Sequence, residues 1–282
     1  MKIVKVLWPL TLLFSLCGCE EKDYHNTVFT SFYPVYEFTS RIVGDLYDVE
    51  NLTPPGMEPH DFELTPKMVA GLYDCKSLFL NGVHMEQWAE DLPKQIKNKT
   101  CDLSKDITIR TTDGKEDPHI WLNPLNAIKE MENVKNYMCE IDETNKDTYI
   151  NNYNEAVVEF TNLDKELMEI ANGLTQKNIV VAHAAYGYMC DRYGLNQIAV
   201  NGVEPDVEPT AQTIEKIIEM VNEYHITTIF TEELISSNVS ELISKECGVK
   251  VEVLSPLEEA DEGEDYITVM RENFEKIKEA SK

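Results

Sequence analysis

The sequence predicts an α/β protein with two lobes, each built from parallel β/α units, and one long helix between them. Strand-like apolar runs alternate with amphipathic runs in both halves of the chain, an order typical of parallel sheets with right-handed crossovers. A stretch without proline, residues 144–174, separates the halves. About 260 residues remain after a predicted leader, more than a single domain usually has, so two lobes are expected.

The elements follow from the spacing of apolar residues, every second residue for strands and every third or fourth for helices. In the first half, the expected strands are 27–32, 47–52 and 77–80, and the expected helices are 36–43 and 66–73. In the second half, the expected strands are 178–182, 197–200, 227–231 and 250–254, and the expected helices are 185–193, 211–224 and 237–247. An acidic loop, 258–265, precedes a final helix, 266–280.

The stretch between the halves has apolar residues three and four apart, from Tyr149 to Ile170, and its only glycine, Gly173, comes late. This pattern predicts one connecting helix about 40 Å long. The alternative is two helices broken near Asn151 and Asn152. The expected organisation is a leader 1–18, a first lobe 19–143, a linker helix 144–174 and a second lobe 175–282.

The N-terminus has the layout of a bacterial lipoprotein signal. Lys2 and Lys5 precede an apolar segment, 6–16, that is too short to span a bilayer comfortably, and Gly18 stands before Cys19. Cys19 is therefore the expected lipidation site, and one acyl anchor would tether the protein to a membrane surface. An ordinary signal peptide is the alternative.

The formal net charge of −26 disfavours nucleic acid and anionic lipid as partners. After Cys19 the cysteines are odd in number and form no C-x-x-C pair, so a zinc ribbon is not expected. A bridge between Cys190 and Cys247 is one option that the sequence leaves open.

Three of the six histidines lie in distinctive settings, far apart in the chain. His60 lies in the sequence PHDFELTP, His119 in DPHIWLNP, and His183 in VAHAAYGY. Singly, each has an ordinary explanation, such as a polar turn at His60 or a core residue at His183. Each also falls in a loop beyond a strand, where α/β proteins bind ligands. Together, the three imidazoles predict one transition-metal site.

These segments resemble the zinc and manganese substrate-binding lipoproteins of bacterial ABC transporters. The resemblance covers nearly the whole chain after the leader, and the segments around His119 and His183 are its most specific parts. Its other parts are Phe32-Tyr33-Pro34, Asn81-Gly82 with Glu86 and Trp88, Arg192-Tyr193-Gly194, Phe230-Thr231-Glu232, and Asp265-Tyr266 with Met270 and Asn273. Many zinc-uptake relatives carry a long histidine-rich loop before the second motif, whereas residues 107–116 here are few and contain no histidine.

The resemblance implies two similar lobes with mostly parallel sheets and one metal in the cleft between them. His60 and His119 would bind from the first lobe and His183 from the second. The fourth ligand would be a carboxylate late in the second lobe, which we assign to Glu258. Glu259 and Glu232 are the alternatives.

Two further residues are assigned supporting roles. Trp121 is expected to shield the site from water. His84 is expected to contact the metal transiently or to line the entrance of the site, with an ordinary surface or packing histidine as the alternative. Three imidazoles favour zinc, whereas manganese-selective relatives tend to present two imidazoles and two carboxylates. Manganese therefore remains the alternative metal.

The expected function is extracytoplasmic capture of Zn²⁺ by a membrane-anchored monomer, which delivers it to a membrane permease driven by a separate ATPase. The chain has no phosphate-binding loop of its own. A zinc hydrolase is the rival from another class, but the His-Glu-x-x-His motif is absent. A surface adhesin is a third alternative. Because the expected function is to bind and deliver zinc, the protein is expected not to be an enzyme.

Overall fold

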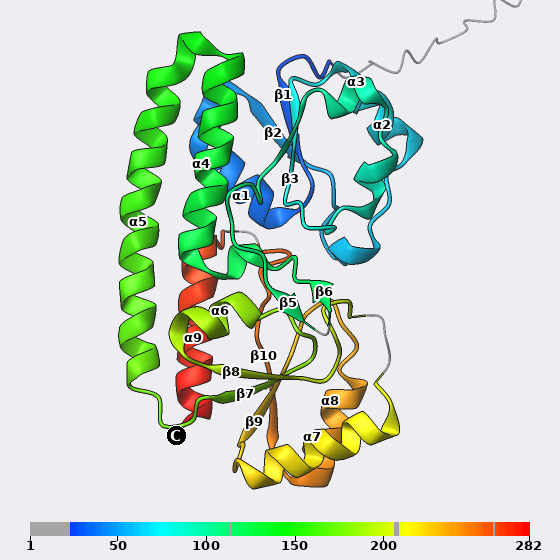
Figure 1. Ribbon diagram of the computed structural model, residues 1–282, viewed down its shortest axis with the longest axis vertical. Helices are drawn as coiled ribbons and strands as arrows, with labels where there is room; N and C mark the ends of the chain where they lie inside the picture. Colours follow the sequence, from blue (N-terminus) through cyan, green and yellow to red (C-terminus); the bar gives the residue numbers. More distant parts are fainter. Residues whose placement is uncertain (1–22, 113, 206–208, 262) are drawn as a thin grey trace, which may run out of the picture.

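The computed structural model describes residues 23–112, 114–205, 209–261 and 263–282. The predicted leader and the predicted lipidation site, Cys19, lie outside these residues. Figure 1 shows two β/α lobes, one above the other, with long helices along one side of both. The predicted α/β architecture of two parallel-sheet lobes is confirmed.

The first lobe is built on a four-stranded parallel sheet in the order β2-β1-β3-β4. Its strands are β1 (Thr27–Thr30), β2 (Asp48–Asn51), β3 (Ser77–Leu80) and β4 (Thr100–Asp102), and its helices include α1 (Tyr33–Val43), α2 (Pro66–Asp74) and α3 (Lys94–Lys97). The two central strands are buried along their whole length, as expected where helices cover both faces of a parallel sheet. Helix α2 begins where Thr65 accepts the Met68 N–H and Pro66 fixes the first turn.

The second lobe repeats this plan with the strand order β10-β9-β7-β8. Its strands are β7 (Asn178–Val181), β8 (Asn196–Ala199), β9 (Thr228–Thr231) and β10 (Lys250–Val253), and its helices are α6 (Gly187–Tyr193), α7 (Ala211–Glu223), α8 (Asn238–Cys247) and α9 (Tyr266–Ala280). Helices α7 and α9 begin at side-chain caps, Thr210 and Asp265. The predicted elements of this lobe are all present, with ends displaced by a few residues.

Helix α5 (Lys146–Asn172) is the predicted connector, and it is a single helix of 27 residues, about 40 Å long. It runs without a break through Asn151 and Asn152, and the Asn152 side chain donates a hydrogen bond to the Ile42 carbonyl at 2.9 Å. In Figure 1 it lies along both lobes, beside α4 (Pro124–Ile141) and α9. The domain boundaries drawn from the sequence remain a prediction.

The sequence-based expectations left out α4, although its signals were present. Asn123 caps the helix by accepting the Leu125 N–H at 3.0 Å, and Pro124 occupies the first turn. The buried residues Ala127, Met131 and Val134 then recur at helical spacing. Strand β4 and the hairpin of β5 (Thr111–Thr112) and β6 (Lys115–Glu116) were also left out, because strands of two or three residues carry almost no periodic signal.

The β5–β6 hairpin lies just before the segment that contains His119. It contacts the second lobe, since Lys115 pairs with Glu204 at 2.7 Å and Arg110 pairs with Asp191 at 3.2 Å. Gly187 of α6 makes room for this contact, because a Cβ atom there would lie 2.0 Å from Arg110 Nη1. The segment thus joins the lobes.

An aromatic cluster joins α1, α5 and α9. The Phe160 ring of α5 stacks on Tyr266 of α9 with centroids 4.8 Å apart and meets the edge of Phe38 of α1 at 6.0 Å. All three side chains are fully buried, and they belong to one hydrophobic core that continues from the first lobe into the second. The two lobes are therefore packed on a shared helical spine.

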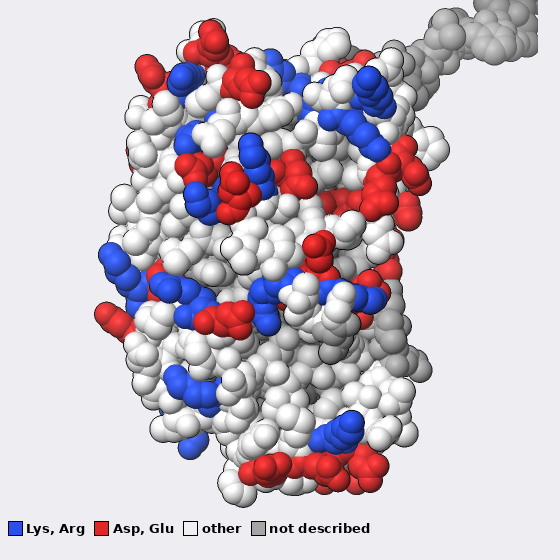
Figure 2. All heavy atoms as spheres, viewed as in Figure 1, with Lys and Arg blue, Asp and Glu red and all other residues white. Residues whose placement is uncertain are grey.

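The surface carries charges of both signs. Figure 2 shows acidic and basic side chains interspersed on the face in view. Among the described residues, no helix combines the length and apolar character needed to cross a bilayer. Cys190 and Cys247 are both free thiols, so the bridge that the sequence left open is not formed.

We expect Phe160→Ala to lower the free energy of unfolding of the metal-free protein by about 3 kcal/mol or more, because it leaves a cavity in the shared core. Val158→Ala on the same helix is the matched control. Val158 is 60% exposed, so its truncation should change stability by less than about 0.5 kcal/mol. Urea unfolding followed by circular dichroism measures both, and equal effects would show that the spine does not hold the lobes together.

Candidate metal centre

His60 is presented by the loop that follows strand β2. The loop turns at Gly56, whose φ of 76° is a conformation that favours glycine, and it ends in a short 3-10 helix, Pro59–Asp61. The Glu58 carboxylate caps this helix by accepting the His60 N–H at 2.9 Å. The cap and Pro59 together fix the backbone that carries the His60 ring.

His119 is held in place by Asp117. Oδ1 of Asp117 accepts both the backbone N–H of His119 at 3.1 Å and its ring Nδ1–H at 2.8 Å. With the proton on Nδ1, the Nε2 atom presents a lone pair. Asn81, which directly follows β3, donates to the Pro118 carbonyl at 2.9 Å and so ties this loop to the carboxyl end of the first sheet.

His183 has the equivalent arrangement in the second lobe. It lies two residues beyond strand β7, and its Nδ1–H donates to the Glu232 carboxylate at 2.8 Å. Glu232 directly follows the neighbouring strand β9. The carboxyl ends of two adjacent strands therefore supply the imidazole and the carboxylate that orients it.

Trp121 packs against His119, with ring centroids 5.2 Å apart, and is fully buried. Its indole N–H donates to the Pro256 carbonyl of the second lobe at 2.7 Å. The Tyr266 hydroxyl, also from the second lobe, donates to the Trp121 carbonyl at 2.6 Å. The ring thus forms an apolar wall beside the imidazole and links the two lobes behind it.

Glu258 reaches the site from the loop that follows β10. Leu257, immediately before it, is fully buried with a φ of 62°, a costly conformation for a residue other than glycine and one that is found where structure around a site enforces it. The Glu258 side chain is buried, and neither of its oxygens has a hydrogen-bond partner among the described residues. Oε1 lies 3.8 Å from Nε2 of both His60 and His119.

The donor atoms of His60, His119, His183 and Glu258 all lie within 4.8 Å of one another. The Nε2 atoms of His60 and His119 are 3.2 Å apart, and those of His119 and His183 are 3.1 Å apart. In a tetrahedral zinc shell with bonds of 2.0–2.1 Å, donor atoms stand about 3.3 Å apart. The two nitrogen–nitrogen distances are close to this value, and Glu258 Oε1 lies somewhat farther away, 3.8 Å from two of the nitrogens.

The ring nitrogens of this group are arranged to bind a cation. Nδ1 of His119 and Nδ1 of His183 each face a carboxylate oxygen, so their Nε2 atoms point toward each other across 3.1 Å. Burial and the neighbouring imidazoles lower the pKa of His60 and His119 well below the usual value. His60 and His119 are therefore neutral, which is the form that binds metals.

The buried carboxyl groups near these rings also favour a bound cation. Burial, and then the proximity of Glu58 and Glu232, raises the pKa of Glu258 well above the usual range. Burial also raises the pKa of Asp117 to about 6 and that of Glu58 to about 7. A cation among these groups would stabilise their ionised forms and reverse the shifts.

Of the residues considered from the sequence, the structure brings together His60, His119, His183 and Glu258. Glu259 instead points toward the first lobe, where it accepts the Gly56 N–H at 2.7 Å, and Glu232 stands behind His183. His84 is 70% exposed and contacts Glu90 and Glu116 on the surface, away from this group. The sequence-based reasoning missed the roles of Asp117 and Glu58, although both stand two residues before a histidine of the site.

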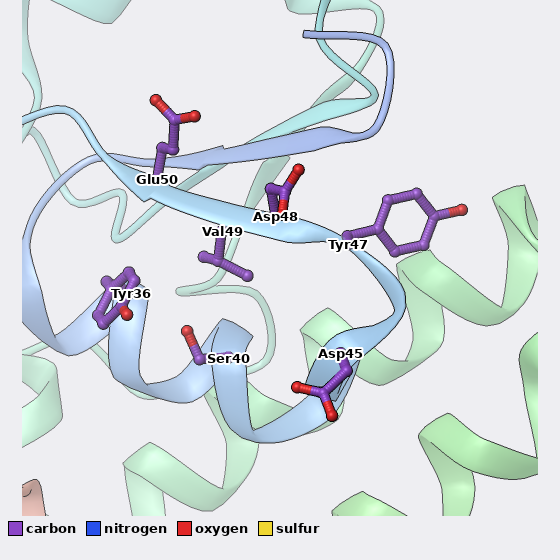
Figure 3. Close-up of a pocket in the computed structure, with 8 residues that line it drawn as sticks. Tyr36, Ser40, Asp45, Tyr47, Asp48, Val49 and Glu50 are labelled. Carbon is purple, nitrogen blue, oxygen red and sulfur yellow. The ribbon is translucent and has the colours of Figure 1, made fainter.

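A separate hollow of about 1040 Å³ lies beside β2 and α1. Figure 3 shows that its carboxylates, on Asp45, Asp48 and Glu50, point in different directions. They do not converge on a common point as the histidine group does. The histidine group is therefore the candidate functional site.

Comparisons of the sequence with known proteins agree on one family. The family model described as "Zinc-uptake complex component A periplasmic" matches residues 28–280. The chain is 33% identical to the high-affinity zinc uptake system protein ZnuA of Bacillus subtilis, over 95% of this chain and 94% of that protein. It is 36% identical to the zinc-binding protein AdcA of Streptococcus pyogenes over 89% of this chain, and this match spans 55% of AdcA.

Solved structures show the same relationship. The laminin-binding protein of Streptococcus agalactiae, described as an adhesin with metal-transporting activity, superposes with a TM-score of 0.85 at 32% identity and covers 91% of this chain and 99% of its own. The Zn(II)-bound ZnuA-like domain of Streptococcus pneumoniae AdcA gives a TM-score of 0.79 at 35% identity, covering 90% and 98%. The chain therefore belongs to the family of periplasmic A components of zinc-uptake complexes.

Proposed function

We propose that this protein is the extracytoplasmic zinc-binding component of an ABC transporter, which captures Zn²⁺ and delivers it to a membrane permease. The observation that carries the proposal is the convergence of three imidazoles and one buried carboxylate whose donor atoms lie within 4.8 Å of one another, with two nitrogen–nitrogen distances close to those of a tetrahedral shell. The names of its relatives, which include a zinc uptake protein and a Zn(II)-bound domain, agree with it.

The donor set supports zinc rather than manganese. Three nitrogen donors and one oxygen donor form a site of intermediate softness, which suits zinc, whereas manganese prefers a larger number of oxygen donors. The orienting carboxylates of Asp117 and Glu232 are engaged with ring N–H groups, so they strengthen the imidazoles as donors instead of adding oxygen ligands.

The position of the donors suggests how capture works. His60 and His119 come from the first lobe, and His183 and Glu258 from the second, so a bound ion would hold the two lobes together at the cleft. The loaded form would then differ from the empty form in how tightly the lobes meet, which gives a permease a means to distinguish them. A permease with its ATPase, and a lipid anchor at Cys19, complete the proposal.

The same geometry favours binding over catalysis. A catalytic zinc keeps one position open for water and needs a nearby general base, whereas four protein donors would fill the shell here. Asp117 and Glu232 are both hydrogen-bonded to the histidine rings. The protein is therefore proposed to act as a receptor and not as a hydrolase. Adhesion, which the description of the Streptococcus agalactiae relative mentions, would be an additional role.

Metal identity tests the proposal directly. Protein purified without added metal should contain one zinc ion per chain, because the donor set selects zinc among the available ions. Native mass spectrometry gives the stoichiometry, and elemental analysis of the same sample gives the element. A preparation that holds mainly manganese would contradict the proposal.

His119→Ala should weaken zinc binding by about 100-fold or more, since zinc affinities of about 10 kcal/mol or above are shared among four ligands. Competition with a fluorescent chelator measures the dissociation constant. His84→Ala removes an exposed histidine of the same lobe and should leave it unchanged. Equal losses for both variants would place the site elsewhere.

A further inference from the structure

The four converging side chains are not equally enclosed. The side chains of His119 and His183 are 0% exposed and that of Glu258 is 2% exposed, whereas the His60 side chain is 9% exposed. The way in for an ion therefore passes the His60 side of the group. Glu58, two residues earlier and half-buried, stands on that side.

The two oxygens of Glu58 have different surroundings. Oε2 accepts the His60 N–H at 2.9 Å, which fixes the carboxylate. Oε1 is buried and has no hydrogen-bond partner among the described residues. A helix cap needs only one oxygen, so the cap accounts for Oε2 and leaves Oε1 unexplained.

Glu58 also lies beside Glu258. The charge of Glu58 acts on the Glu258 carboxyl group, and neither oxygen of Glu258 has a hydrogen-bond partner among the described residues. Two carboxylates placed together repel unless a proton or a cation lies between them. The pair is therefore a place where a divalent cation would be stabilised next to the four converging donors.

Taking the proposed zinc function as given, we propose that Glu58 is a capture ligand. Its Oε1 would bind the incoming ion together with Glu258, before the ion passes to the three imidazole nitrogens. Glu58 is not one of the four residues whose donor atoms all lie within 4.8 Å of one another, so it does not belong to the final shell. Carboxylate oxygens bind hydrated cations readily and can replace bound water stepwise.

A ligand that holds the ion only on its way in or out lowers the activation barrier for both association and dissociation of the ion. Its loss should slow association and dissociation together and leave the dissociation constant nearly unchanged. A resident ligand would behave differently, because its loss would speed dissociation and weaken binding. The ratio of the two rate constants therefore separates the two roles.

The test is stopped-flow mixing of the metal-free full-length protein with zinc, followed by chelator-induced release. Glu58→Gln keeps an oxygen for the His60 N–H and removes the charge, and it should slow association by about 10-fold, within the range by which local charge affects cation capture. Glu58→Ala should slow association at least as much. Glu63→Gln removes an exposed carboxylate of the same segment and should associate like the wild type.

Three results would overturn the proposal. The first is unchanged association in Glu58→Gln or in Glu58→Ala. The second is weaker binding through faster dissociation alone, and the third is an equal slowing in Glu63→Gln, which would indicate general charge attraction. The wild-type measurement separates the proposed zinc function from the capture role of Glu58. A wild-type protein that takes up no zinc would refute the proposed function. Rapid uptake by all variants would refute only the role of Glu58.

Discussion

The hydrogen bonds that tie Nδ1 of His119 to Asp117 and Nδ1 of His183 to Glu232 are the constraint on which the rest of the site depends. They fix the tautomer of each ring, so both Nε2 lone pairs point into the same small space. The two Nε2 atoms are thereby held 3.1 Å apart. The fold therefore contains a preformed site for a cation.

The fold can hold this arrangement because its two lobes share a core. Parallel strands deliver Asn81, His183 and Glu232 to the carboxyl ends of the two sheets, where α/β proteins commonly place ligands. The spine of α5 and α9 and the Trp121 contacts across the lobes then keep these two edges facing each other. Without that spine, the donors from the two lobes would not stay within bonding distance of one ion.

The sequence was sufficient for the alternation of strands and helices, the linker helix and the histidine trio, because each has a local signal. It was not sufficient for the choice among Glu232, Glu258 and Glu259, because the direction of each carboxylate depends on contacts with distant residues. Glu259 turns to Gly56 and Glu232 to His183, while the left-handed backbone at Leu257 precedes Glu258. The role proposed for Glu58 likewise depends on a distant residue, Glu258, on which its charge acts. Helix α4 is different, since its cap and periodicity were present and were overlooked.

The central claim is that one zinc ion binds between His60, His119, His183 and Glu258. Crystals of the zinc-loaded protein, measured above and below the zinc absorption edge, test it most directly. The account predicts one strong anomalous peak, with three nitrogen atoms and one carboxylate oxygen at about 2.0–2.2 Å. A principal peak at the cysteines or at the surface cluster around His84, with none among these four residues, would contradict it.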